Sequence, residues 1–376
     1  MKKGWNQARL DELTEADSPI TYGVVKPGDP GEVLFIRGGD LVGGRVLDNQ
    51  LRTITSAVSE QYRRTLLRGG ELLICLVGQP GQVAVAPASL AGANIARQVG
   101  LIRLRSSIDA EFISYFLQSP EGLAHLGTYT GGSVQQVINL SDLRTVNVPV
   151  PPLAEQQRIV GLLDEAFEGL ATAKANAEKN LQNARALFES YLQSVFTQRG
   201  PGWVEKNLGD LCQIKTGKKD VNEGNPEGKY PFFTCAAAHT FSDYYSFDTE
   251  ALLVAGNGNV GQVSYYSGKF EAYQRTYVLF DFKGVTAKYL FRVLDKRLSA
   301  TVSKQKLGNT MPYIKIGMLT DFVVPVPPPK EQELVAESLS AIAEETQRLA
   351  HLYERKLAAL EELKKSLLRQ AFSGKL

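Results

Sequence analysis

The sequence is poor in the residues that build most metal and redox sites, with 3 Cys and 3 His among 376 residues. Cys75, Cys212 and Cys235 form no CxxC pair, and their odd number excludes a disulfide framework and a cysteine-rich zinc site. Cys235 and His239 lie close together in the sequence, but a lone Cys/His pair is far more often structural than a ligand set. We therefore expect no bound metal.

Long apolar runs and a strong net charge are also missing. The longest apolar runs, such as residues 71–77, are too short to span a bilayer, and residues 1–7 lack the apolar stretch of a signal peptide. We therefore expect a cytoplasmic location. The 42 basic and 40 acidic residues leave a net charge of +2, which taken alone argues against a nucleic-acid partner. A hydrophobic content of 43% and this length indicate two or three globular domains.

An internal repeat organises the chain. The segment PVPP at 149–152 recurs at 325–328, and at this shift of 176 the segments 149–196 and 325–372 share 14 identities in 48 positions without a gap. Upstream, the shift between the two copies is no longer constant, but matching segments still occur in the same order. For example, LLICLVGQPGQV at 72–83 matches LLVAGNGNVGQV at 252–263. Such self-similarity predicts two copies of one structural plan.

A long stretch without proline and almost without glycine follows each proline cluster. Apolar residues recur there in steps of three and four, which is typical of a coiled-coil seam, and only Thr346 and Lys364 interrupt the second copy. About 46 residues at 1.5 Å each predict a rod of roughly 69 Å. We expect the two helices to bury each other. The predicted interface consists of Ile159, Leu163, Leu170, Leu181 and Phe188 in the first helix, and Val335, Leu339, Ile342, Leu349, Leu357 and Leu360 in the second.

The remaining segments have a mixed α/β pattern. In the first, apolar or alternating runs predict strands at 33–37, 72–77, 82–86 and 99–104, and residues 110–118 have helical periodicity. The second repeats this order at 251–255, 262–266, 277–282 and 287–294. The predicted organisation is therefore a globular domain at 1–150, a helix at 151–200, a second globular domain at 201–328 and a second helix at 329–376. The fold class is α/β (α+β), with a pseudo-twofold internal repeat.

A GxGxxG motif at 256–261 follows an apolar strand and raises the possibility of a dinucleotide site. That motif must open a helix, whereas the residues that follow have strand composition. The repeat partner lacks the first glycine, and the shared Gly-x-x-Gly-Gln-Val predicts a hairpin turn instead. We find no catalytic triad, paired-carboxylate motif, phosphate loop or methyltransferase tetrapeptide, so the sequence predicts a non-catalytic chain.

Polar loops are the remaining candidates for function. We expect two sets at equivalent places in the two halves: 129–136 with 305–313, and 36–40 with 215–220. Gln, Asn and Arg can read base edges, and Lys can hold phosphates, although loops of this composition are more often simple turns. The candidate DNA-binding residues are Arg37, Arg63, Arg64, Ser133, Gln135, Gln136, Lys218, Lys219, His239, Arg275, Lys306, Asn309, Thr310 and Tyr313.

Charge is unevenly divided between these segments. Residues 1–150 carry 14 basic and 14 acidic groups, whereas 201–328 carry 15 and 12. The helical segments are balanced or slightly acidic, with 5 and 6 in 151–200 and 8 and 8 in 329–376. A DNA-binding surface would therefore depend on local clustering, such as Arg63 with Arg64 or Lys218 with Lys219.

Together these features resemble the specificity (S) subunits of type I restriction–modification systems, over nearly the whole chain. The markers are the duplicated VPVPP…EQ segments at 148–156 and 324–332, each leading into a long helix. The approaches GGSVQQVINLSDL and GNTMPYIKIGML, and the segments FIRGGDL at 35–41 and LLRGGELLICLVGQPGQVAV at 66–85, are also similar to those of the family. The second copy departs by having Pro329-Lys330 where the first has Leu153-Ala154.

The resemblance implies two target-recognition domains, each reading one half of a bipartite DNA sequence, and two antiparallel helices that fix the half-site spacing. It also implies two modification subunits that carry S-adenosylmethionine and methylate adenine N6. Two restriction subunits would add ATP- and Mg-dependent translocation and cleavage. This chain itself would bind no cofactor. Two other functions stay open on the residues alone: a coiled-coil adaptor that binds proteins through its globular halves, and a dinucleotide-dependent enzyme resting on residues 256–261.

Overall fold

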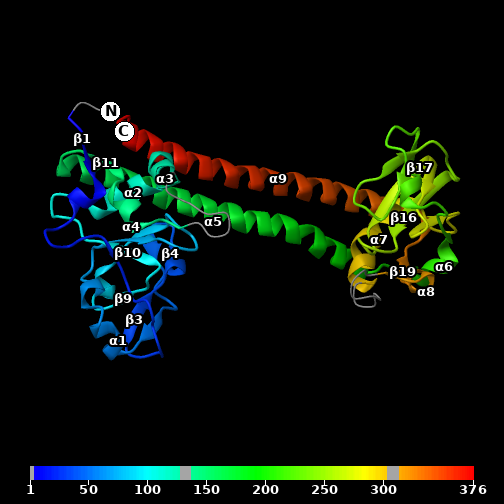
Figure 1. Ribbon diagram of the computed structural model, residues 1–376. Helices are drawn as coiled ribbons and strands as arrows, with labels where there is room; N and C mark the ends of the chain where they lie inside the picture. The colour runs from blue at the N-terminus through cyan, green and yellow to red at the C-terminus, as the bar shows by residue number, and fades with distance from the viewer. Residues whose placement is uncertain (1–3, 128–136, 303–312) are drawn as a thin grey trace. The chain divides into compact units, whose positions relative to one another are not determined.

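The computed structural model describes residues 4–127, 137–302 and 313–376. The chain divides into two compact units: unit 1 comprises residues 1–178 and 355–376, and unit 2 comprises residues 179–354. Each unit contains one globular α/β domain together with part of each of two long helices, α5 and α9 (Figure 1). The α/β class, the repeat and the two long helices predicted from the sequence are therefore confirmed.

The long helices α5 (Leu153–Thr197) and α9 (Pro329–Ser373) have 45 residues each. Both begin at a proline cluster, and a glutamate in the first turn of each helix complements the helix dipole. In unit 1 they run antiparallel, because Lys174 pairs with Glu361 at 2.7 Å while Arg158 donates to the backbone oxygen of Leu376. The pairing in unit 2 has the same direction, with Arg185 and Glu354 at 2.8 Å.

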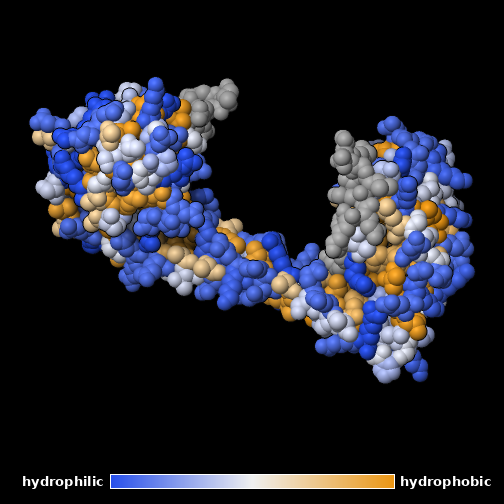
Figure 2. Space-filling model, turned by 90° about the horizontal axis from the view of Figure 1, so that it is seen from below, coloured by the Kyte–Doolittle hydropathy of each residue, from blue (hydrophilic) through white to orange (hydrophobic). Residues whose placement is uncertain are grey.

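The predicted seam positions are all buried or half-buried in the two helices. Figure 2 shows hydrophobic residues between hydrophilic ones along the helix segments. The two interruptions are accommodated locally. The hydroxyl of Thr346 donates to the backbone oxygen of Ile342, and the ammonium of Lys364 lies 5.2 Å from the centre of the Phe167 ring.

The globular domain of unit 1 contains short sheets and short helices. Its strands are β1 (Asn6–Arg9), β2 (Thr21–Tyr22), β3 (Val33–Ile36), β4 (Leu41–Val42), β5 (Arg45–Val46), β6 (Arg52–Ile54), β7 (Leu72–Cys75), β8 (Val83–Val85), β9 (Asn94–Ile95), β10 (Val99–Ile102) and β11 (Asn147–Val150). They pair as β1-β11, β2-β10-β7-β8, β6-β3-β9 and β4-β5. The helices are α1 (Ser56–Glu60), α2 (Ala110–Gln118), α3 (Pro120–Gly127) and α4 (Leu140–Arg144), with 3-10 turns at Leu10–Leu13, Gly38–Asp40, Arg63–Thr65 and Ala88–Leu90.

The globular domain of unit 2 is built around a six-stranded sheet of order β13-β18-β16-β17-β14-β15. These strands are β13 (Gln213–Thr216), β14 (Tyr230–Phe233), β15 (Thr240–Ser242), β16 (Phe247–Ala255), β17 (Val263–Ala272) and β18 (Thr276–Phe280). A separate pair joins β12 (Val204–Asn207) to β19 (Val323–Val326). The helices are α6 (Leu208–Leu211), α7 (Ala287–Val302) and α8 (Ile316–Thr320), with a 3-10 turn at Val221–Glu223.

The predicted hairpins are present in both domains, and no dinucleotide fingerprint forms. β7 pairs antiparallel with β8, and β16 with β17, so the GxGxxG segment leads into a strand and not into a helix. Gly81 and Gly261 both have positive φ, 89° and 81°, as these turns require. The equivalence expected between loops 36–40 and 215–220 is wrong. β3 pairs parallel with β9, as β14 does with β17, so residues 36–40 correspond to the loop after Phe233.

A close contact between two backbone segments, present in both units, supports this correspondence. A Cβ on Gly23 would lie 1.9 Å from the backbone oxygen of Ile95, and one on Gly217 would lie 1.9 Å from that of Ala272. The segment after β2 is therefore the partner of the segment after β13. Composition misled the sequence comparison, because RGGD and TGKKD look alike although they follow different strands.

A glutamine joins each long helix to the domain that precedes it. The amide of Gln156 accepts a bond from the backbone N–H of Asp109 at 2.8 Å and donates to the backbone oxygen of Pro151 at 2.8 Å. Gln332, its repeat partner, does the same with Thr286 at 2.9 Å and Pro327 at 3.1 Å. Both glutamines are buried. The duplicated Glu-Gln therefore has a structural role: it fixes the start of each long helix against the cap of α2 or α7.

The ends of the long helices complete the hydrophobic cores. In unit 1, Leu368, Ala371 and Phe372 of α9 join the core of the first domain, and the Phe372 ring lies 5.2 Å from that of Phe112. In unit 2, Phe188, Leu192 and Phe196 of α5 join the core of the second domain. No helix in the described residues carries an apolar stretch that could cross a lipid bilayer.

Candidate nucleic-acid interface

Several loops of unit 2 gather around the start of β18. They are residues 217–220, 234–239, 256–261 and 273–275, together with Tyr313, and we call them the unit 2 rim. Backbone bonds hold them together: the N–H of Gln274 donates to the oxygen of Lys219, and that of Gly256 donates to the oxygen of Arg275, both at 2.9 Å. A bridge joins Asn257 to Tyr313, and the thiol of Cys235 lies 3.4 Å from the oxygen of Arg275.

This rim brings five of the candidate residues into one loop cluster: Lys218, Lys219, His239, Arg275 and Tyr313. The side chains of Lys218 and Arg275 are exposed. Lys219 is paired with Glu223 at 2.6 Å, which partly neutralises its charge. The ring of His239 is held between those of Phe233 at 5.2 Å and Phe241 at 5.4 Å. The arrangement can offer cations to a phosphate backbone and flat polar side chains to base edges.

The equivalent loops of unit 1 carry less free charge. Arg37 forms two side-chain bonds to Asp40, at 2.9 and 3.2 Å, and that carboxylate also accepts the backbone N–H of Arg37. The guanidinium of Arg37 therefore stabilises the 3-10 turn Gly38–Asp40. Arg63, which pairs with Glu60, and the exposed Arg64 both lie on the 3-10 turn Arg63–Thr65. A bridge from Val77 to Val137 repeats the bridge between Asn257 and Tyr313. The remaining candidates lie outside the described residues: Ser133, Gln135, Gln136, Lys306, Asn309 and Thr310.

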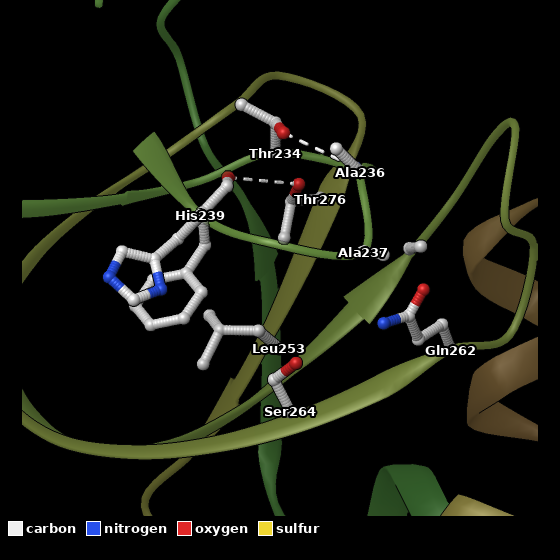
Figure 3. Close-up of a pocket in the computed structure, with 10 residues that line it drawn as sticks. Thr234, Ala236, Ala237, His239, Leu253, Gln262, Ser264 and Thr276 are labelled. Carbon is white, nitrogen blue, oxygen red and sulfur yellow. Dashed lines mark hydrogen bonds between the residues drawn. The ribbon is translucent and has the colours of Figure 1, made fainter. Parts of the chain in front are cut away.

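A small pocket opens beside the unit 2 rim, with a volume of about 50 Å³. Leu253 and Ala255 of β16 line it, as do Ala236 and Ala237 of the loop after β14. Polar side chains line it as well, among them Thr234, Ser264 and Thr276 (Figure 3). The side-chain amide of Gln262 lines it and forms no hydrogen bond with the residues that the structure describes. In Figure 3, His239 and Gln262 lie on opposite sides of Leu253. The pocket thus has a mixed apolar and polar lining, in which the amide of Gln262 is available.

An exposed aromatic patch in unit 2 was missed by the sequence reasoning. Tyr244 is 74% exposed, and the rings of Tyr230 and Tyr245 lie 4.9 Å apart. The ammonium of Lys269 lies 4.7 Å from the centre of the Tyr245 ring, and that of Lys229 lies 5.7 Å from Tyr230. Tyrosines interleaved with lysines suit contact with a nucleic acid or a protein. The adjacent tyrosines in an otherwise polar stretch were the one clue in the sequence.

Each unit also has a groove between its domain helix and the long helices. In unit 1 the groove has a volume of about 880 Å³ and lies between α2, α5 and Lys364 of α9. In unit 2 it has about 430 Å³ and lies between α7, α9 and the end of α5. The two grooves are repeat-equivalent, since Tyr115 bonds Asp164 in the first and Arg292 bonds Ser340 in the second. Their chemistry differs, because a carboxylate in one is replaced by a hydroxyl in the other.

Burial raises the pKa of Glu111, in the unit 1 groove, to about 7. The negative charges of Asp164 and Asp109 raise it further, and Arg45 partly opposes them. The pKa of Tyr115 is raised as well, by burial and by its bond to Asp164. Across the described residues, no group of three or more His, Cys, Asp or Glu side chains could hold a metal ion.

The raised pKa of Glu111 predicts a pH-dependent stability. Between its ordinary value of 4.5 and about 7, the folded state keeps a proton that the unfolded chain has lost, so stability falls as pH rises through that window. We expect Glu111→Gln to remove this fall and to stabilise unit 1 at pH 8 by about 1 kcal/mol, after allowance for partial exposure. Thermal unfolding at pH 5 and pH 8 measures the effect. Glu165→Gln, an exposed carboxylate on α5, is the control, and equal pH profiles for all three proteins would refute the prediction.

Comparison with known proteins gives a consistent result. The sequence matches the family described as the type I restriction modification DNA specificity domain over residues 2–181 and again over residues 201–356. It is 36% identical over 174 residues to the specificity subunit of the type I restriction enzyme EcoDI of Escherichia coli, covering 46% of this chain and 38% of that protein. It is 30% identical over 198 residues to the EcoBI specificity subunit of the same organism, covering 52% and 40%. The chain thus spans about two fifths of these two relatives.

Known structures share the whole fold. One is from a study titled as the structural basis of complex assembly and conformational transition of the type I R-M system. It matches with a TM-score of 0.78 at 20% identity, covering 100% of this chain and 99% of that one. The HsdS subunit from Thermoanaerobacter tengcongensis matches with a TM-score of 0.64, also at 20% identity, covering 100% and 98%. With the family matched separately in each repeat, the chain belongs to the DNA specificity subunits of type I restriction–modification systems, the non-catalytic subunits of those systems.

Proposed function

We propose that the two globular domains, residues 1–150 and 201–328, each contact one half of a bipartite DNA target. The observation that carries the proposal is the duplicated loop cluster: equivalent loops after equivalent strands, with different side chains in the two units. A repeated scaffold with divergent loops suits the reading of two different half-sites at a fixed separation. Membership of a family described as a DNA specificity domain supports this function.

The basic side chains of the unit 2 rim contact phosphates in this proposal, whereas its polar side chains face base edges. Unit 1 attracts DNA phosphates less strongly, because the guanidinium of Arg37 forms an ion pair with Asp40. With a net charge of +2, the chain alone binds DNA weakly. Partner subunits that add positive charge would then be needed for tight binding.

The long helices set the half-site spacing and dock the partners. Two repeat-equivalent grooves within one chain support two copies of one partner, namely the modification subunits, and restriction subunits join the assembly through them. These partners would carry S-adenosylmethionine, ATP and Mg, and the assembled complex would methylate adenine N6 and cleave DNA. Because base methylation needs the base outside the stack, the part played by this chain is to position the partners on the target.

Footprinting of the chain in complex with its modification subunit tests the proposal. We expect protection of one bipartite sequence. The double variant Lys218→Ala/Arg275→Ala should weaken binding and reduce the slope of log K against log salt by roughly 1.8, about 0.9 for each phosphate that the protein no longer neutralises. Lys283→Ala, an exposed lysine after the far end of β18, is the matched control.

Sequence-independent protection would refute the function. The alternative, a coiled-coil adaptor that binds proteins through its globular domains, predicts a different result. In that case, substitutions at Gln135, Gln136, Asn309 and Thr310 leave DNA selectivity untouched, and so does the double variant. Footprints of both sets of variants on the same DNA fragment separate the two functions.

A further inference from the structure

We infer that the small pocket of unit 2 receives the 5-methyl group of a thymine in the half-site that unit 2 reads. The inference rests on the proposed DNA-recognition function and goes beyond it by naming a base and the residues that select it. The residues concerned are Ala237, Leu253, Ala255 and Gln262.

The pocket is large enough for a substituent of a DNA base but too small for the base ring. A water-sized group occupies roughly 10–15 Å³ on the same measure, so about 50 Å³ holds a few such groups. A whole base cannot enter, but a methyl group and the atom beside it can. The pocket therefore suits the edge of a base that stays in its duplex.

The lining selects among the four bases. Leu253 and Ala255 are 3% and 6% exposed, and with Ala237 they offer an apolar surface. Gln262 adds an amide with no partner among the described residues, and its N–H can donate. In the major groove, only thymine places a methyl group next to an acceptor, its O4, whereas the other bases present polar atoms alone. The hydroxyls of Thr234 and Thr276, which also line the pocket, are bonded to backbone groups, and Ser264 adds one further hydroxyl. The apolar side chains beside the available amide of Gln262 match that edge of thymine.

The position of the pocket agrees with this role. Thr276 lines it at the start of β18, where the rim loops meet, and its hydroxyl donates to the backbone oxygen of Phe233 at 3.2 Å. Cys235, next to the pocket wall, contacts the backbone oxygen of Arg275. A duplex held at its phosphates by Lys218 and Arg275 would thus have base edges beside the pocket. His239 closes the side opposite Gln262 (Figure 3).

Unit 1 fills the corresponding space. Cys75 stands in the repeat where unit 2 has Ala255, and a Cβ on Gly38 would lie 2.6 Å from its sulfur. The backbone of the loop after β3 therefore packs directly on this part of the sheet. The structure thus restricts methyl reading by this pocket to one of the two half-sites, which makes the inference specific.

Replacement of thymine by deoxyuridine tests it without changing the protein. The complex of the full chain with its modification subunit is titrated with targets that carry one deoxyuridine at a time. We expect one position in the unit 2 half-site to weaken binding about fourfold, the value of one buried methyl group. Ala237→Leu, which fills the pocket from an exposed loop, should weaken binding to the thymine target and abolish the difference between thymine and deoxyuridine at that position. Ala238→Leu, its exposed neighbour outside the pocket, should retain the difference.

Three results would overturn the inference while the bipartite footprint persists: a unit 2 half-site without thymine, no weakening at any deoxyuridine position, or an unchanged difference in Ala237→Leu. Loss of the bipartite footprint in the unmodified protein would instead refute the proposed function itself. The two failures are therefore distinguishable in one set of titrations.

Discussion

Deletion of residues 172–185 from α5 and 352–365 from α9 is expected to shorten the preferred spacer between the half-sites. Each deletion removes two heptads, or about 21 Å of helix, and keeps the apolar stripe in register. The two segments face each other: the ion pairs of Lys174 with Glu361 and of Arg185 with Glu354 lie inside them. The residues that join either domain core, Phe188 and Leu368 among them, are left in place.

Methylation of a DNA library with every spacer length measures this effect, because all rotational phases of the half-sites are then present. At 3.4 Å per base pair the spacer should lose about six base pairs. Deletion from α5 alone is the control: it leaves facing segments of unequal length and should abolish bipartite methylation. An unchanged spacer preference in the double deletion would rule out the helices as the spacing element.

Gln332→Ala is expected to destabilise unit 2 by about 3 kcal/mol. Gln332 is 2% exposed, and its amide bonds Thr286, Pro327 and the backbone oxygen of Gly284. Truncation leaves the N–H of Thr286, at the cap of α7, buried without its acceptor, and each group left unsatisfied in this way costs about 1–3 kcal/mol. For a unit of this size, the melting temperature of unit 2 should fall by about 6–12 °C.

Gln156→Ala should have the same effect on unit 1, since its amide makes equivalent bonds to Asp109 and Pro151. Gln347→Ala, an exposed glutamine of α9, is the control and should melt like the unchanged chain. Calorimetry of each single variant measures the melting temperatures of both units. A destabilisation below about 0.5 kcal/mol for both buried glutamines would show that they do not fix the helix starts.

Much of the architecture could be predicted from the sequence because it depends on local and periodic signals. Steps of three and four, proline at the helix starts and the duplicated Gly-x-x-Gly-Gln-Val are independent of the rest of the fold, and they located α5, α9 and both hairpins. The role of the duplicated glutamine could not be predicted. Its partners Asp109 and Thr286 are more than forty residues away, and no spacing rule connects them.

The candidate interface was harder to predict, because it also depends on residues that are distant in the sequence. Lys218 and Arg275 lie close together because the end of β13 pairs with the start of β18, and that pairing is a property of the sheet. The pocket beside them depends on Ala255 where the first repeat has Cys75, a difference that is ordinary in sequence but decides whether a space exists. Arg37 was a reasonable candidate by composition, and its bond to Asp40 could be seen only in the structure.

The division of the first core between distant parts of the chain has a consequence during synthesis. Residue 355, where the second part of unit 1 begins, follows residue 178 by 177 positions. At ribosomal rates of about 5–20 residues per second, the first domain waits roughly 9–35 s with the surface of Phe112 and Phe116 uncovered. The second domain, whose segments are contiguous, has all its parts before the first does. The second domain can therefore complete its core before the first, whose Phe112 and Phe116 stay uncovered until Phe372 has been synthesised.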